Sequence, residues 1–108
     1  MEKWILYVGT NCGEAGKEQE FCDWYDNIHL PDVLETPGFK RATRYENPEA
    51  KEGEARYIAI YEIETDDIDA CMKSAEANIA RIREAGRLTP LLQIAGRGLY
   101  RQIGELSN

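Results

Sequence analysis

The chain has 108 residues, enough for one domain with a hydrophobic core, and 43% hydrophobic content excludes intrinsic disorder. Its 20 acidic and 13 basic residues give a net charge of −7, which argues against nucleic acid and anionic membranes as partners. No apolar run is long enough to cross a membrane, no signal peptide is apparent, and three scattered cysteines form no disulfide framework, so we expect one cytoplasmic domain over residues 1–108.

The first half of the chain predicts a strand, a helix and a second, shorter helix. Residues 3–9 are a short run of aromatic and branched side chains, typical of a strand. Residues 17–28 carry large apolar side chains at three- and four-residue steps, which predicts a helix with one buried face. Leu30-Pro31 is expected to interrupt this helix, because proline lacks an N–H. Residues 32–35 then form a short helix that ends at Pro37-Gly38.

The second half predicts two strands, a helix and a last strand. Residues 39–46 alternate, with Phe39, Arg41, Thr43 and Tyr45 expected on one face of a strand. Residues 56–64 are apolar on both faces, which favours a central strand. Thr65 is expected to cap a helix that ends at Gly86, and residues 91–103 are expected to form the last strand.

The order strand, helix, strand, strand, helix, strand is that of a ferredoxin-like α+β fold. It predicts a four-stranded antiparallel sheet with both helices on one face. Both faces of two strands are apolar: Ile58 and Ile60 lie opposite Tyr57, Ala59, Tyr61 and Ile63 on the third strand, and Ile5 and Tyr7 lie opposite Trp4, Leu6 and Val8 on the first. An uncovered apolar face predicts a partner, and the simplest one is a second copy, giving a homodimer packed through the open sheet face.

One segment also carries a family resemblance. Trp24-Tyr25-Asp26-Asn27-Ile28-His29-Leu30-Pro31, followed by Pro37-Gly38-Phe39 and Arg44-Tyr45, resembles the EthD-like branch of the dimeric α/β-barrel superfamily. That superfamily includes isomerases, polyketide cyclases, cofactor-free monooxygenases, haem-handling proteins and stress proteins. The resemblance therefore implies a dimeric barrel and a cleft between sheet and helices, with His29 at or near the cleft. It selects no reaction.

His29 is the only histidine and the first candidate for chemistry. Its imidazole could act as a general acid or base, or could instead close the end of the first helix by bonding exposed carbonyls. Asp26 and Asp32, three residues away on either side, could fix its tautomer or could serve only as surface and helix-start charges. One histidine with scattered acids predicts no metal site.

Four aromatic residues and one arginine complete the candidate site. Trp24, Tyr25, Tyr45 and Tyr61 could line a pocket for an aromatic ligand, or could be ordinary packing. Arg44 could neutralise a ligand carboxylate or enolate, or could pair across strands with Glu46 or Glu62.

The sequence and the resemblance thus predict a protein that binds a small, mostly apolar molecule, aromatic or polyketide-like. If it is an enzyme, we expect isomerase, cyclase or lyase chemistry without a cofactor, in which His29 moves a proton, Tyr45 or Arg44 polarises an oxygen and Trp24 packs on the ligand. The alternatives are a non-catalytic binding or stress-response module, and a cofactor-free or haem-linked monooxygenase.

Overall fold

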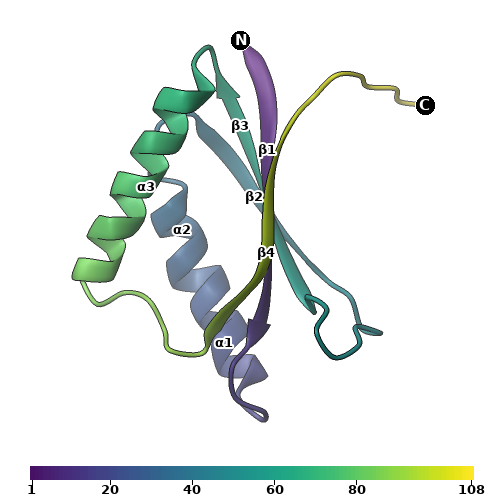
Figure 1. The fold of residues 1–108 in the computed structure, drawn as a ribbon, viewed down its shortest axis with the longest axis vertical. Coiled ribbons are helices and arrows are strands. Elements are labelled where there is room, and N and C mark those ends of the chain that lie inside the picture. Colours follow the sequence, from purple (N-terminus) through teal and green to yellow (C-terminus); the bar gives the residue numbers. More distant parts are fainter.

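The computed structural model describes residues 1–108 and contains one four-stranded antiparallel sheet. Its strands are β1 (Glu2–Cys12), β2 (Phe39–Glu46), β3 (Tyr57–Thr65) and β4 (Leu92–Arg101), in the order β2-β3-β1-β4. Figure 1 shows all helices on one side of this sheet, leaving its other side bare. The predicted ferredoxin-like fold, with β3 as a central strand, is confirmed.

The first helical segment does not break at Leu30-Pro31 as expected. It runs as α1 (Glu18–Trp24), a π-helical turn η1 (Tyr25–His29) and α2 (Leu30–Val33), and both His29 and Leu30 keep helical backbone angles. The Leu30 amide donates to the carbonyl of Tyr25, five residues back. The wider turn lets the helix continue into a proline without the usual clash.

The expected alternation of β2 is wrong at its first residue. The pairing with β3 shifts between Phe39 and Arg41, so Lys40 is an extra residue in the strand. Such a bulge reverses the faces on either side of it. Phe39 consequently lies on the helix side of the sheet with Ala42 and Arg44, and it is buried there.

The turn between α2 and β2 requires a glycine. Gly38 has a φ of 93°, and an added Cβ would lie 3.2 Å from the Cys71 sulfur and 3.3 Å from the Glu64 carbonyl oxygen. Pro37-Gly38 therefore ends the helical segment as predicted and allows β2 to pack tightly beneath α3 (Ile68–Glu84).

The start of α3 is capped by Asp67 rather than by Thr65. The Asp67 side chain accepts a hydrogen bond from the Ala70 amide at 3.1 Å, while the Thr65 hydroxyl accepts from the Asp67 amide. Two successive side-chain bonds thus set the point where β3 ends and α3 begins.

The core lies between the sheet and the helices, and it is rich in aromatic side chains. Phe21 is fully buried, with ring centroids 5.7 Å from those of both Tyr25 and Tyr57. The opposite face of the sheet carries partly exposed apolar side chains, including those of Ile5, Tyr7, Ile58, Ile60, Tyr45 and Tyr100. None of the helices is long and apolar enough to span a membrane.

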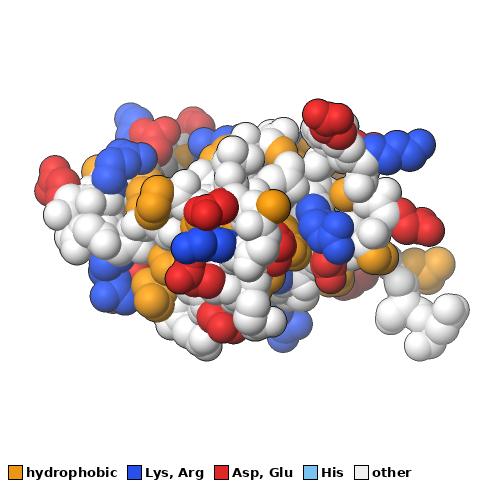
Figure 2. Space-filling model, turned by 90° about the horizontal axis from the view of Figure 1, so that it is seen from below, with side chains coloured by type: hydrophobic (Ala, Val, Ile, Leu, Met, Phe, Trp, Pro, Cys, Tyr) orange, Lys and Arg blue, Asp and Glu red, His pale blue; other side chains and the backbone are white.

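The surface charges are mixed. In Figure 2, which views the lower end of the molecule, acidic and basic side chains are interspersed and hydrophobic ones form small groups. This end therefore presents no broad field of one sign that would attract a polyanion.

Candidate functional site

A cavity of about 450 Å³ lies between the sheet and α3, and its lining is mostly hydrophobic. η1 contributes Tyr25 and His29, β3 contributes Tyr61, and α3 contributes Met72 and Ile79. Segments far apart in the sequence therefore meet here. This size and composition are typical of a site for a small, largely apolar molecule.

His29 is held rigidly in the wall of this cavity. Its ring stacks on Trp24, with a centroid distance of 4.7 Å and an interplanar angle of 20°, and meets the Tyr25 ring edge-on at 5.0 Å. Only 6% of the residue is exposed. The Nδ1 atom of the ring is buried and has no hydrogen-bond partner within the chain.

The surroundings of His29 keep its imidazole neutral. The pKa of His29 is lowered to about 4, chiefly by burial; the charge of Asp32 opposes this shift, and the positive charge of Arg44 adds to it. At neutral pH the ring can therefore accept a proton or a hydrogen bond. The sequence also leaves open that His29 closes a helix end by bonding exposed carbonyls. The helix instead continues through His29, and its ring makes no such hydrogen bond.

Two tyrosines beside His29 remain protonated. Burial raises the pKa of Tyr61, and the neighbouring Tyr25 hydroxyl raises it further. Burial also raises the pKa of Tyr25, although a hydrogen bond with Tyr61 and the charge of Arg44 partly offset this. The cavity wall thus combines a neutral imidazole with a hydrogen-bonded pair of protonated phenols, which has one O–H left to donate to a ligand.

Arg44 lies outside the cavity, behind the aromatic wall. Its guanidinium carbon is 4.3 Å from the centroid of the Tyr25 ring and 5.4 Å from that of Tyr57. Its Nη1 pairs with Asp26 at 3.0 Å, so the partners expected across the strands, Glu46 and Glu62, are not used. Arg44 therefore supports Tyr25 and acts on His29 only through its charge.

The other sequence candidates are divided between two faces. Trp24 touches His29 and donates from its indole nitrogen to the Arg87 carbonyl at 2.9 Å, but it does not line the cavity. Tyr45 lies on the open face of the sheet and is 56% exposed. The structure thus brings Tyr25, His29 and Tyr61 together and separates Tyr45 from them.

The two aspartates near His29 have other partners. Asp32 pairs with Arg87 at 2.6 Å, and its backbone carbonyl accepts from the Asn78 side chain. Asp26 is engaged by Arg44. Neither carboxylate hydrogen-bonds to the imidazole. No group of three or more His, Cys, Asp or Glu side chains is placed to hold a metal ion.

Sequence reasoning missed the charged rim of the cavity. Arg83 lies on the same face of α3 as Met72, Glu76 and Ile79, and Arg97 lies on β4. The three- and four-residue helical spacing that relates Met72, Ile79 and Arg83 could have placed Arg83 on the face of α3 that lines the cavity. No sequence pattern places Arg97 at the cavity, because its position depends on how β4 pairs with β1.

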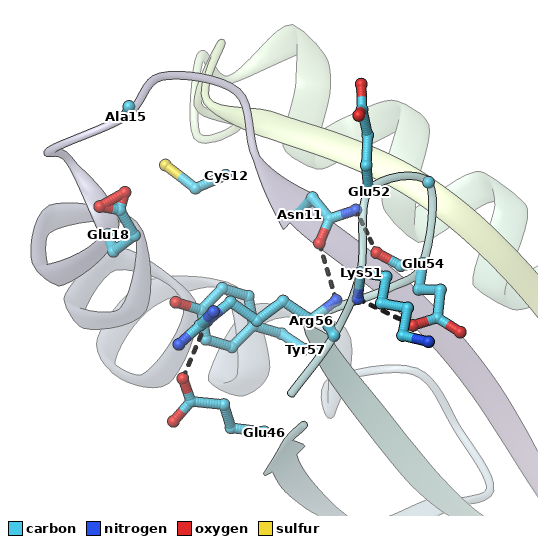
Figure 3. A pocket seen from close by; sticks show the side chains of 12 residues that line it. Asn11, Cys12, Ala15, Glu18, Glu46, Lys51, Glu52, Glu54, Arg56 and Tyr57 are labelled. Carbon is cyan, nitrogen blue, oxygen red and sulfur yellow. Dashed lines mark hydrogen bonds and ion pairs between the residues drawn. The ribbon is translucent and has the colours of Figure 1, made fainter. Parts of the chain in front are cut away.

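A second, more open hollow of about 700 Å³ lies between the end of β1 and the β2–β3 loop (Figure 3). Several of its polar groups are bonded to one another. Arg56 pairs with Glu46 at 3.0 Å, and the Asn11 side chain donates to the Glu54 carbonyl and accepts from the Arg56 amide.

Comparison with known proteins places the chain in a family. Residues 4–86 match the family described as "Domain of unknown function (DUF4286)". The chain belongs to this family. A comparison with curated proteins finds no match. The match covers most of the domain, and the family description itself names no activity.

Solved structures confirm the fold of this DUF4286 member. HapK from Hahella chejuensis has a TM-score of 0.71 and 12% identity, with 97% of each chain covered. A mutant of SnoaB, a cofactor-independent oxygenase from Streptomyces nogalater, has a TM-score of 0.67 and 18% identity, covering 97% of this chain and 98% of that one. The haem degrader MhuD from Mycobacterium tuberculosis has a TM-score of 0.64 and 19% identity, covering 96% and 99%.

Further matched chains are a dimeric ferredoxin-like protein from an uncultured marine organism, with a TM-score of 0.60, and an EthD family protein from Bacillus halodurans, with a TM-score of 0.49. HapK and the marine protein confirm the resemblance to ferredoxin-like proteins. At these identities the likeness concerns the fold alone.

Proposed function

We propose that this protein binds a small, mostly apolar molecule in the cavity beside His29 and catalyses a proton transfer on it without a cofactor. Isomerisation, cyclisation and related lyase steps belong to this class. The observation that carries the proposal is the state of His29, whose ring is buried, neutral and clamped, and which is free of any hydrogen-bond partner within the chain.

The roles of the residues follow from their chemistry. His29 removes a proton from a carbon beside a carbonyl group and returns it at another position. Hydroxyls of Tyr25 or Tyr61 donate to the carbonyl oxygen as negative charge develops there. A base whose pKa is near 4 is weak in the empty site, but that developing charge raises the pKa of His29 and makes it a better proton acceptor.

The decisive experiment measures proton exchange. Wild-type protein is incubated in D2O with an enolisable aromatic ketone such as 2-tetralone, and loss of the α-proton signal is followed by NMR. We expect His29→Gln to slow exchange by about a hundredfold or more while the fold is retained. Asn27→Ala is a matched control, because Asn27 is exposed on the same π-helical turn.

Equal exchange by folded wild type and His29→Gln would remove His29 from the reaction. Absence of exchange in the wild type, combined with ligand binding, would favour a non-catalytic binding module.

A cofactor-independent oxygenase is the second candidate. The architecture shared with SnoaB supports it, and the same proton removal would produce a carbanion able to react with oxygen. Oxygen consumption with the exchanging ketone distinguishes this outcome from isomerisation. For the haem-linked alternative, a Soret band that depends on His29 after haem is added would be the diagnostic result.

We also propose that the protein acts as a homodimer joined through the open face of its sheet. This face carries Ile58 and Ile60 together with Tyr7, and no segment of the chain covers it. Ile60→Glu should convert a dimer to a monomer in analytical ultracentrifugation, because a charge at the centre of an apolar interface is costly. Glu49→Gln, in the exposed β2–β3 loop, is the control, and a wild-type monomer would refute the proposal.

A further inference from the structure

Two arginines stand at the mouth of the His29 cavity. Arg83 from α3 and Arg97 from β4 both line the cavity, and both are exposed. The inner wall is different, since His29, Tyr25 and Tyr61 are all buried. The cavity therefore runs from a positively charged mouth to an inner end with hydrogen-bonding aromatic groups.

These two arginines differ from the rest of their kind in this chain. Ion pairs with carboxylates occupy Arg41, Arg44, Arg56, Arg87 and Arg101. Arg81 donates to the Asn78 side chain. Arg83 and Arg97 form no ion pair, although one carboxylate, that of Glu76, also lines the cavity.

The two arginines contrast with the overall charge of the protein. A protein with a net charge of −7 repels anions at long range, and acidic residues outnumber basic ones 20 to 13. The two arginines without ion pairs make the mouth of the apolar cavity locally positive and able to attract an anion. A guanidinium recognises a carboxylate through two parallel hydrogen bonds, which also orients the bound molecule.

We infer that the ligand of this cavity is an apolar aromatic or polyketide-like acid, whose carboxylate binds Arg83 and Arg97 and whose enol or phenol end reaches His29. This inference rests on the proposed function, because it adds a substrate class to the same site. The carboxylate sets the orientation, and the aromatic body fills the apolar middle between the mouth and the tyrosines.

The test compares an acid with its neutral counterpart. The probes are 6-hydroxy-2-naphthoic acid and 6-hydroxy-2-naphthamide, which have nearly the same shape and differ in charge. Binding is followed through the imidazole NMR signals of His29, which are unambiguous because there is one histidine. We expect the acid to bind wild-type protein about tenfold more tightly than the amide, with a preference that weakens as salt is raised.

Arg83→Gln combined with Arg97→Gln should abolish this preference, because it lowers the affinity for the acid to about that for the amide. Lys73→Gln is the matched control, because it removes an exposed positive charge from α3 away from the cavity and should retain the preference.

Two results would overturn the inference. If acid and amide bind equally, the cavity takes aromatic ligands without selecting an anion, and the proposed function stands without this refinement. If the preference for the acid survives the double substitution, Arg83 and Arg97 do not bind the carboxylate; the inference is then wrong, and the proposed function stands without it. If neither probe moves the His29 signals, the cavity does not accept such ligands, and the proposed function fails together with the inference.

Discussion

The two hollows of this molecule differ in a way that separates a candidate site from a surface depression. The hollow beside the β2–β3 loop is larger, about 700 Å³ against about 450 Å³, but it is more open and more polar, and its Arg56 is already paired with Glu46. The cavity beside His29 is smaller and apolar, and it contains a buried imidazole nitrogen without a partner. Unused bonding capacity in a dry setting, rather than volume, marks the place where a ligand has something to gain.

The largest expected effect concerns the wall behind His29. Phe21→Ala should lower the free energy of unfolding by about 3–5 kcal/mol, because the fully buried ring packs on Trp24, Tyr25 and Tyr57. Urea denaturation followed by tryptophan fluorescence measures the change. Phe21→Leu should recover much of the loss. A loss below about 1 kcal/mol would mean that this wall is not tightly packed.

The next effect is the response of stability to pH. The unfolded chain protonates its histidine below about pH 6.5, whereas burial lowers the pKa of His29 to about 4 in the folded chain. Stability from this residue is therefore present above about pH 6.5 and is lost as the pH falls toward 4, by roughly 3 kcal/mol.

Comparison with His29→Gln isolates this contribution from the carboxylates. The stability of the wild type should fall more than that of His29→Gln when urea unfolding is measured near pH 7 and again near pH 4. Parallel losses in the two proteins, or an NMR titration of His29 near its ordinary pKa, would show that the ring is not desolvated.

The smallest effect is expected in the second hollow. Replacing Glu46 and Arg56 together by glutamine removes an exposed ion pair, and such pairs contribute little. Thermal unfolding and exchange of the ketone should both be unchanged. A clear loss of exchange would reverse the distinction between the two hollows and direct attention to the surface in Figure 3.

Local pattern predicted the elements well and their irregularities poorly. The spacing of Phe21, Trp24 and Tyr25 gave the buried helix face, but the widened turn through His29 and the bulge at Lys40 were missed. Both irregularities change the count of residues within an element. Periodicity arguments assume that this count is regular, so they place Phe39 on the wrong face after a single extra residue.

The candidate site was predictable where its members are neighbours in the chain. His29 and Tyr25 share a turn, whereas Tyr61 joins them only through the packing of β3 against the helices. Tyr45 fails this test, because strand propensity alone does not say which face meets α3.

By itself the sequence determined the order of the elements, the buried faces of the helices and the position of its single histidine, because these depend on the spacing of side chains over a few residues. Only the tertiary structure decided that Tyr61, Arg83 and Arg97 share a cavity with His29. It also decided that the ring is neutral and without a partner. Desolvation and charge coupling arise from atoms brought together by packing, and their effects fall off over ångströms in space rather than with separation along the chain.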